Sequence, residues 1–528
     1  MEGTFWAFMP AIIAIVLALV TKQVYISLFT GIFVGAMMYV GGNPLKALFT
    51  LYQVMSEKVG SNAPIIVFLV VLGILVVLMQ KSGGARAYGE WAGGKIKTKG
   101  GALAATAGLG CLIFVDDYFN CLTVGSVMRP VTDKFKISRS KLAYIIDATA
   151  APVCIIAPIS SWAAAVAGEL EGDGLVVFMS TIPFNVYALL TLIMVFSLCF
   201  FKFDFAKMKR NDDIAEKTGD VHAGVEFDAK EDEAIVANAK GKVRHLLIPV
   251  IILIACCIGG MIYTGFFYNW DTNEIVTELQ SSNVIEAFSN CDAGMSLAIG
   301  STVALVIIAT YYMLARVVSF KDIMGSFTEG FKAMVPAILI LTFAWSISGI
   351  MGAKGGYLDA QAFVQNNLAN SSFPQYLFPM IFFVLAGLIA FSTGTSWGTF
   401  GVLVPIAVTL LGGSGTLALL TVSATLGGAV FGDHVSPISD TTILASAGAQ
   451  CDHVDHVSTQ LPYASLIAGI SVVAYLIAGI CVNSGLNSVL SGVIMWVATL
   501  ALFALAVVVI KCMGKKAQAK TENNGDNN

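Results

Sequence analysis

A polar stretch in the last quarter of the chain contains the residue types from which a cation site can be built. Residues 432–446 read GDHVSPISDTTILAS and place Asp433, His434 and Asp440 among hydroxyl side chains within otherwise apolar sequence. Carboxylate, hydroxyl and carbonyl oxygens are the ligands that a hard cation prefers. Pro437 stands between the two aspartates, and a proline inside a helix frees backbone carbonyl oxygens. The stretch therefore predicts a broken helix that can hold a cation.

The composition indicates that these polar groups lie in a membrane. Of the 528 residues, 57% are hydrophobic and 12% are charged, and this charged share is about half that of a soluble domain. Runs near the ~20 apolar residues that cross a bilayer as a helix are 5–21, 24–41, 62–80, 183–201, 246–266, 296–316, 333–351, 463–483 and 489–511. With broken spans at 142–168 and 416–447, we expect an all-α polytopic membrane protein of about 11 transmembrane helices. Two re-entrant hairpins are expected as well, at 100–128 and 376–411.

Five aspartates fall at the expected membrane depth, namely Asp116, Asp117, Asp147, Asp433 and Asp440. An ionised carboxylate there costs several kcal/mol unless it is hydrated, paired or metal-bound, so each is a functional candidate. The alternatives are a hairpin tip that reaches water for the first pair and a helix cap for the last pair. Asp147 follows Lys141 closely and has the alternative of facing the interface. His434 is either a proton relay, since its ordinary pKa is ~6.5, or a packed neighbour of Asp433.

Amide and hydroxyl side chains near the expected helix breaks extend the candidate site. Pro152 and Pro158 are expected to break a helix of the first half, as Pro437 does in the second. The further candidates are Asn120, Ser160, Ser161, Thr393, Thr395, Ser396, Ser436, Ser439, Thr441 and Thr442. These groups either bind a cation or substrate, or they satisfy freed backbone groups. A Na⁺ site formed by Asp116, Asp433 and Asp440 is the resulting hypothesis.

Lysine and arginine residues predict the orientation, because cytoplasmic loops carry an excess of them. Segments 81–99 and 129–141 each hold five basic residues, so both are placed inside. The apolar segment between them, 100–128, must then enter the membrane and return as a hairpin with Asp116 and Asp117 at its tip. Segment 267–295 is acidic and lacks Lys and Arg, which suits the outside. The N-terminus is expected outside and the C-terminus in the cytoplasm.

Two parts of the chain match element by element with opposite orientation. Residues 62–201 and 333–483 each read as a span, a hairpin, a broken span and a span, which predicts two inverted repeats, a common plan of secondary transporters. The other expected units are N-terminal transmembrane helices over 1–61, a charged cytoplasmic linker over 202–245, scaffold helices with an extracytoplasmic loop over 246–332, and a C-terminal helix with a cytoplasmic tail over 484–528.

Several function classes lack support in the sequence. No GxxxxGK[ST] phosphate loop is present, so an ion gradient rather than ATP is expected to drive any transport. The cysteines are expected to be buried thiols, and DHVDH at 452–456 is interpreted as a solvated or helix-capping segment rather than a metal cluster. We expect no enzyme activity, no resident cofactor and no nucleic-acid partner.

Two long motifs resemble a known family. They are VFGDHVSPISDTTILASAGAQCDHVDHVSTQLPYA at 430–464 and FVDDYFNCLTVGSVMRPVTDKFKISRSKLAYIIDATAAPVCIIAPISSWAA at 114–164. Both look like the NhaC-type Na⁺/H⁺ antiporter family of the ion-transporter superfamily, with similarity from about residue 60 to 485. The resemblance implies Na⁺/H⁺ exchange across a bacterial inner membrane and a homodimer with an elevator-like motion. It leaves the solute open, because relatives are thought to carry organic acids or amino acids.

The leading hypothesis is Na⁺/H⁺ antiport in which intramembrane aspartates bind Na⁺ and H⁺ competitively. Asp433 and Asp440, with Asp116 or Asp117 from the other repeat, would hold the ions. The alternative is Na⁺- or H⁺-coupled transport of a small organic solute, an amino acid or organic acid, whose carboxylate would meet the hydroxyl groups at 160–161 and 393–396 near half-helix ends. A channel or receptor is a more distant third class.

Overall fold

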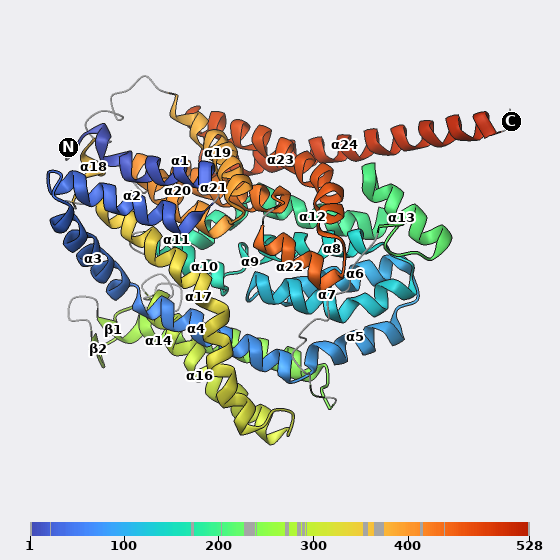
Figure 1. The fold of residues 1–528 in the computed structure, drawn as a ribbon, viewed down its shortest axis with the longest axis horizontal. Helices are drawn as coiled ribbons and strands as arrows, with labels where there is room; N and C mark the ends of the chain where they lie inside the picture. The colour runs from blue at the N-terminus through green and yellow to red at the C-terminus, as the bar shows by residue number, and fades with distance from the viewer. Residues whose placement is uncertain are drawn as a thin grey trace.

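The chain folds almost entirely into helices (Figure 1). The computed structural model describes residues 3–21, 23–170, 174–201, 203–225, 238, 240–269, 274–281, 287, 291, 293–351, 357–363, 374–411, 415–437 and 439–525. The first elements are η1 (Phe5–Phe8), α1 (Met9–Thr21), α2 (Val24–Tyr39) and α3 (Pro44–Ser61). The first half continues with α4 (Ala63–Lys81), α5 (Gly84–Lys95), α6 (Lys99–Leu112), α7 (Asp117–Lys134), α8 (Arg139–Ala148), α9 (Ala151–Cys154), α10 (Ser161–Ala167), α11 (Gly174–Thr181), η2 (Ile182–Phe184), α12 (Val186–Phe201) and α13 (Ala206–Thr218).

The remaining elements follow the charged connector. They are α14 (Arg244–Phe267), the short antiparallel strands β1 (Tyr268–Asn269) and β2 (Glu274–Ile275), α16 (Ala293–Leu314), α17 (Phe320–Met351), α18 (Ala360–Phe363), η4 (Gln375–Leu377), α19 (Phe378–Thr393), α20 (Ser396–Leu411), α21 (Thr416–Val435), α22 (Asp440–Ala449), α23 (His453–Asn483) and α24 (Ser488–Gly525). One large hydrophobic core joins both halves, and a smaller one packs α1, α2 and α3 against the end of α17.

The predicted multi-pass, all-α character is confirmed. Among the described residues, eight helices are long and apolar enough to cross a membrane, or up to ten if each bent pair forms one span. The bent pairs are 25–39 with 44–61, which turn by 117°, and 320–335 with 338–351, which turn by 43°. The expected run at 5–21 is helical over the same residues, beginning with the 3₁₀ turn η1 and continuing as α1.

Both expected hairpins have a helix break at their tips. In the first hairpin α6 ends at Leu112 and α7 begins at Asp117. The Asn120 amide holds this tip together, because its Nδ2 donates to the carbonyl oxygens of Gly110, Ile113 and Thr149 at 2.7, 3.1 and 2.9 Å. In the second hairpin Gly394 separates α19 from α20 at φ 68°, a left-handed conformation that glycine adopts without strain.

Both expected broken helices are interrupted near their prolines. Helix α21 ends at Val435 and α22 begins at Asp440, so the break predicted at Pro437 is present. Ser439 caps α22 by accepting a hydrogen bond from the Thr442 N–H at 3.1 Å. In the first half α8 ends at Ala148 and α10 begins at Ser161, with only the four residues of α9 helical between them. Helix ends with free backbone groups are thereby brought into the interior.

Helices α7 and α22 cross closely through two glycines. A Cβ atom on Gly125 would collide with the backbone of Gly448, and one on Gly448 would lie 2.5 Å from the carbonyl oxygen of Cys121. Small residues at such crossings let two backbones approach within van der Waals contact. This crossing joins the first hairpin to the second broken helix.

Gly125→Ala is expected to lower the thermal stability of the purified protein by the equivalent of about 1–3 kcal/mol, the usual cost of overpacking. The matched control is Gly108→Ala in α6, where an added Cβ meets nothing within 4 Å. Melting in detergent, followed by circular dichroism, compares the two variants. Equal melting temperatures for both would show that α7 and α22 do not pack as described.

Helix α13 shows that the charged connector is not a fully solvated loop. Lys141 at the start of α8 is 2% exposed, and its Nζ lies 2.7 Å from Asp204 and 3.3 Å from Asp212. Asn211 donates to Asp455 at the start of α23 with a distance of 2.8 Å. Buried charges require such partners. Asp204, just before α13, and Asp212 within it therefore neutralise a buried lysine of α8, and Asn211 connects α13 to α23.

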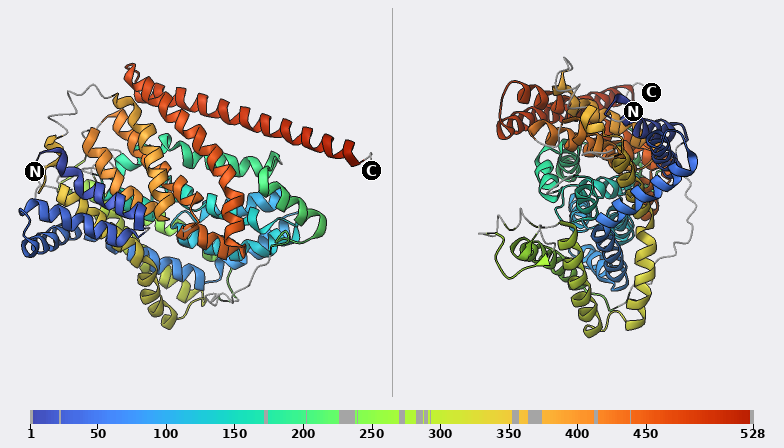
Figure 2. Two further views of the ribbon diagram at one scale, coloured as in Figure 1. Left: turned by 45° about the horizontal axis from the view of Figure 1, so that its top comes forward. Right: turned by 90° about the vertical axis from the view of Figure 1, so that its left-hand side faces the viewer.

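Opposite ends of the molecule carry different segments. Figure 1 shows the N-terminus, β1, β2 and α18 toward one end of the long axis, and α13 and the C-terminus toward the other. The turned view in Figure 2 preserves this separation and shows α24 extending past the helical body. The helix breaks lie between these two ends, which is where a transport site is expected in a broken-helix transporter.

Candidate functional site

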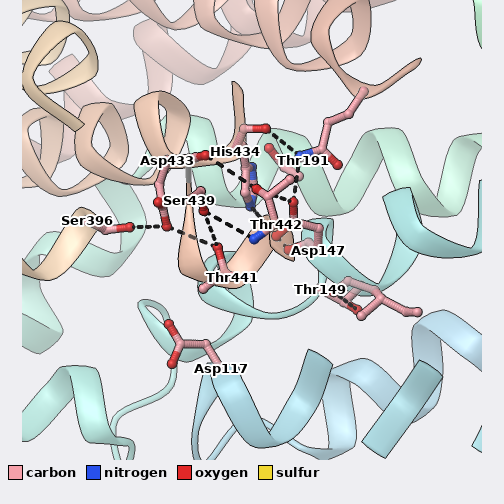
Figure 3. A network of polar contacts seen from close by, with 12 residues as sticks. Asp117, Asp147, Thr149, Thr191, Ser396, Asp433, His434, Ser439, Thr441 and Thr442 are labelled. Atoms are coloured by element: carbon pink, nitrogen blue, oxygen red, sulfur yellow. Dashed lines mark hydrogen bonds and ion pairs between the residues drawn. The ribbon is translucent and has the colours of Figure 1, made fainter. Parts of the chain in front are cut away.

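Asp433 lies in the last turn of α21, immediately before the break at Pro437, and is 1% exposed. Its Oδ2 accepts a hydrogen bond from Ser396 Oγ at 2.7 Å and another from Thr441 Oγ1 at 3.1 Å (Figure 3). Ser396 begins α20 and Thr441 lies in the first turn of α22. Two segments of the second half, α20 and α22, therefore place hydroxyl oxygens around the buried carboxylate that α21 carries.

Asp147 lies near the end of α8 and is fully buried. Its Oδ2 accepts hydrogen bonds from Gln460 Nε2 at 2.7 Å and Thr442 Oγ1 at 3.0 Å, and His456 Nε2 lies 3.4 Å away. Its Oδ1 has no hydrogen-bond partner within the described ranges and lies 3.9 Å from His434 Nε2. The alternative that Asp147 faces the membrane interface is wrong, because helices of the second half enclose it.

Thr442 and His434 connect Asp147 to the helix end that carries Asp433. The Thr442 hydroxyl contacts Asp147 Oδ2 at 3.0 Å and the backbone carbonyl of Asp433 at 3.4 Å. His434 Nδ1 lies 3.0 Å from the Tyr187 hydroxyl, and its Nε2 lies 3.2 Å from the backbone carbonyl of Asp147. We call Asp147, Ser396, Asp433, His434, Thr441, Thr442, His456 and Gln460 the polar network. Figure 3 shows its members from both halves facing one another.

The acids of the first hairpin are buried in protein rather than exposed to water. Asp116 is 2% and Asp117 0% exposed. Asp117 Oδ2 accepts a hydrogen bond from Trp162 Nε1 at 3.0 Å, which ties the tip of the hairpin to α10. In Figure 3 Asp117 lies beside the polar network on the side of Thr441. Nonhelical backbone at membrane depth is stable when protein surrounds it in this way.

Several predicted hydroxyl and amide groups are engaged with the backbone. Ser160 donates to the Cys154 carbonyl at 2.7 Å and caps α10, while Ser436 donates to the Phe391 carbonyl at 2.7 Å. Thr393 donates to Ile389 O at 2.9 Å, and Thr395 accepts from the Gly398 N–H at 3.4 Å. Among these predicted hydroxyl and amide groups, Ser161 Oγ and Asn120 Oδ1 are buried oxygens without a hydrogen-bond partner in the described part of the chain.

Sequence reasoning missed two members of the polar network, His456 and Gln460. His456 and Gln460 stand four residues apart on α23, a spacing that places both on one face of a helix. Asp452 caps this helix by accepting from the Asp455 N–H at 2.8 Å, so the capping interpretation of DHVDH is confirmed. The interpretation as a solvated segment is wrong for His456, which is fully buried.

One candidate has a side chain outside the described part of the structure. The side chain of Asp440 is not among the described side chains, so its predicted part in a Na⁺ site stays a prediction. Within the described residues, no group of three or more His, Cys, Asp or Glu could hold a metal ion. A monovalent ion at Asp433 would therefore depend on the Ser396 and Thr441 hydroxyl oxygens as well as the carboxylate.

Thr442→Val is expected to weaken Na⁺ binding by about tenfold while the protein stays folded, because it removes the hydroxyl that contacts both carboxylate-bearing segments. The control is Thr499→Val in α24, since in the described part of the chain the Thr499 hydroxyl donates to the Met495 carbonyl one helical turn earlier at 2.7 Å, away from the helix breaks. Na⁺ affinity is read from the concentration dependence of transport in proteoliposomes. Equal Na⁺ affinities for both variants would show that Thr442 is not part of the site.

Comparison with known proteins places the chain in a family. A family model described as the Na⁺/H⁺ antiporter family matches residues 169–480. An uncharacterised protein of Haemophilus influenzae is 38% identical over 502 residues, covering 90% of this chain and 91% of that protein. The malate-2H⁺/Na⁺-lactate antiporter of Bacillus subtilis is 32% identical over 31% of this chain and 32% of its own. The arginine/ornithine antiporter ArcD of Halobacterium salinarum is 37% identical over 21% of this chain and 24% of its own length. The chain belongs to the Na⁺/H⁺ antiporter family, whose members are membrane transporters.

Proposed function

We propose that the protein exchanges Na⁺ for H⁺ by secondary active transport, with both ions competing for Asp147 and Asp433. One observation carries this proposal: two buried carboxylates, one from each half of the chain, share a hydrogen-bond network at two helix breaks. An ionised carboxylate in such a place needs a counter-ion, which a proton or a cation can supply. Membership of the Na⁺/H⁺ antiporter family supports the same reading.

Competition follows from the oxygen chemistry of the network. Ser396 and Thr441 donate hydrogen bonds to Asp433 Oδ2. When Na⁺ arrives, the two hydroxyl groups rotate their hydrogens away and present lone pairs together with the carboxylate. When a proton binds instead, the carboxyl becomes neutral and loses its attraction for Na⁺. Each ion therefore expels the other, and exchange needs no ATP.

The finer architecture belongs to the same proposal. Residues 62–201 and 333–483 would form inverted repeats within about 11 transmembrane helices, because each repeat presents a hairpin followed by a broken helix. The N-terminus would lie outside and the C-terminus in the cytoplasm of a bacterial inner membrane. The basic segments and their place at one end of Figure 1 support this orientation. A homodimer follows from the family resemblance.

A second candidate function is Na⁺- or H⁺-coupled transport of an organic acid or amino acid. Two relatives favour it by name, a malate-2H⁺/Na⁺-lactate antiporter and an arginine/ornithine antiporter. In that case Ser161 and Asn120, which have buried oxygens without hydrogen-bond partners in the described part, would meet the polar groups of the solute. Asp147 and Asp433 would then hold the driving ion.

Transport by the purified protein in liposomes tests the proposal. With an imposed pH gradient and a fluorescent pH indicator inside, addition of NaCl should collapse the gradient, whereas choline chloride should not. Protein-free liposomes provide the blank. Gradient collapse that requires malate, lactate or arginine together with Na⁺ would replace the first function by the second. No response to Na⁺ under either condition contradicts both.

A further inference from the structure

Glu169 is a buried carboxyl group outside the polar network. It follows α10, and its N–H donates to the Val166 carbonyl at 3.0 Å. The residue is 7% exposed, and neither carboxylate oxygen has a hydrogen-bond partner in the part of the chain that the structure describes. A glutamate that is this deeply enclosed is ordinarily paired, so this one requires an explanation.

The Glu169 carboxyl lies where α10 meets α17 and α20. A Cβ atom on Gly401 of α20 would lie 3.8 Å from Glu169 Oε1. A Cβ on the preceding Gly168 would lie 3.1 Å from Trp345 Nε1 of α17. That indole nitrogen is itself buried without a hydrogen-bond partner among the described residues. An unpaired acid and an unpaired donor thus lie at the same contact between the two halves.

Charges that could neutralise an ionised Glu169 are sparse. Lys58 of α3 is the charged group whose field reaches the carboxyl, and within the described ranges no ion pair joins the two side chains. Its stem packs across Gly349 of α17. Helices α11, α16 and α20 contain no charged residue, α4 has only its last residue, Lys81, and the charges of α17 stop at Lys332, well before Trp345.

An ionised carboxylate in these surroundings is much less stable than the neutral acid. It would forfeit its hydration without gaining a hydrogen bond or an ion pair. Helix α10, with the sequence SWAAAVA, contains no charged residue that could offset this loss. A protonated carboxyl avoids this cost and still packs against the small residue Gly401. The neutral form is therefore the one that suits this packing.

We propose that Glu169 is a second proton-binding site, protonated while α10 packs against α17 and α20 and ionised when these helices separate and water reaches it. This site would release a proton to one side of the membrane when the two halves move apart. Its part in a transport cycle rests on the proposed function. Its protonation in the packed state does not, because that depends only on the surroundings of the carboxyl.

Infrared difference spectroscopy of the full-length protein in lipid nanodiscs tests the site directly. At neutral pH, the wild-type spectrum minus that of Glu169→Gln should contain the C=O stretching band of one protonated carboxylic acid. Asp213→Asn is the control, because the exposed Asp213 should contribute carboxylate bands and no acid band. Carboxylate bands in the Glu169 difference spectrum would overturn the proposal.

Glu169→Asp provides the second variant, since it keeps the acid if the glutamine variant fails to fold. It should retain an acid band at a shifted frequency, and a band of unchanged frequency would show that the acid is not residue 169. Na⁺-dependent transport is measured on the same preparations. An acid band without such transport contradicts the proposed function alone, and transport with an ionised Glu169 contradicts the second site alone.

Discussion

Asp147→Asn is expected to abolish Na⁺-dependent proton movement while the protein remains folded. The asparagine keeps the size of the side chain and can still contact Gln460 and Thr442, but it removes the negative charge that a cation or proton must neutralise. Loss of one partner from a buried charge pair costs about 3–5 kcal/mol, which corresponds to at least about a hundredfold loss of ion affinity. Transport by proteoliposomes at several Na⁺ concentrations measures the effect.

Asp213→Asn is the matched control for this prediction. Asp213 belongs to α13 and pairs with Lys209 one turn earlier on the helix surface at 3.3 Å, so the same chemical change occurs far from the helix breaks. Surface pairs of this kind contribute little to stability, and transport should stay close to that of the wild type. If the folded Asp147→Asn variant transports at the wild-type rate, Asp147 is not part of the ion site.

Asp433→Asn and Ser396→Ala separate the effect of charge from that of hydrogen bonding. The first substitution removes the carboxylate at the break of α21 and should eliminate transport. The second removes one of two hydroxyl groups that contact Asp433 Oδ2, so Na⁺ affinity should fall by about tenfold with transport retained at high Na⁺. The concentration dependence of proteoliposome uptake distinguishes a lost site from a weakened one.

The order of these two effects is the critical result. If Ser396→Ala impairs transport as severely as Asp433→Asn, then hydrogen-bonded geometry rather than charge limits the process. If Asp433→Asn transports Na⁺ normally, the competitive site lies elsewhere in the chain. Monodisperse elution from size-exclusion chromatography confirms that each variant has folded before transport is measured.

Local sequence signals predicted the helix breaks and part of the site. Pro437 between two aspartates was sufficient to place a break, because a proline's effect on a helix is local. The membrane-spanning character followed from composition, and the orientation that the basic segments predict stays a prediction. Asp433, His434, Ser396 and Thr441 were candidates on chemical type alone, and the structure brings all four into the polar network.

The rest of the site depends on packing between distant segments. Asp147 meets His456 and Gln460 only because α8 lies against α23, and nothing in the sequence near Asp147 indicates that neighbour. The same limit applies to hydroxyl groups, since a serine beside a helix break can bind an ion or cap a helix. Ser160 and Ser439 cap helices, and their neighbours alone could not distinguish these roles.

Glu169 illustrates the limit most clearly. In the sequence it stands in the segment GELEGDG, which reads as a polar turn. Its burial arises from α17 and α20, which follow it by more than a hundred residues. A buried acid is therefore recognisable only when the contacts of these later helices are known.

Proton release on Na⁺ binding is the most direct test of competition for the same carboxylates. Purified protein in weakly buffered detergent solution is mixed with NaCl, and the change in pH is followed with a soluble indicator, with choline chloride as the blank. The wild-type protein should release protons in proportion to the Na⁺ bound, and both Asp147→Asn and Asp433→Asn should lose this release. Saturable binding of ²²Na⁺ without any proton release would contradict the exchange of Na⁺ and H⁺ at these two aspartates.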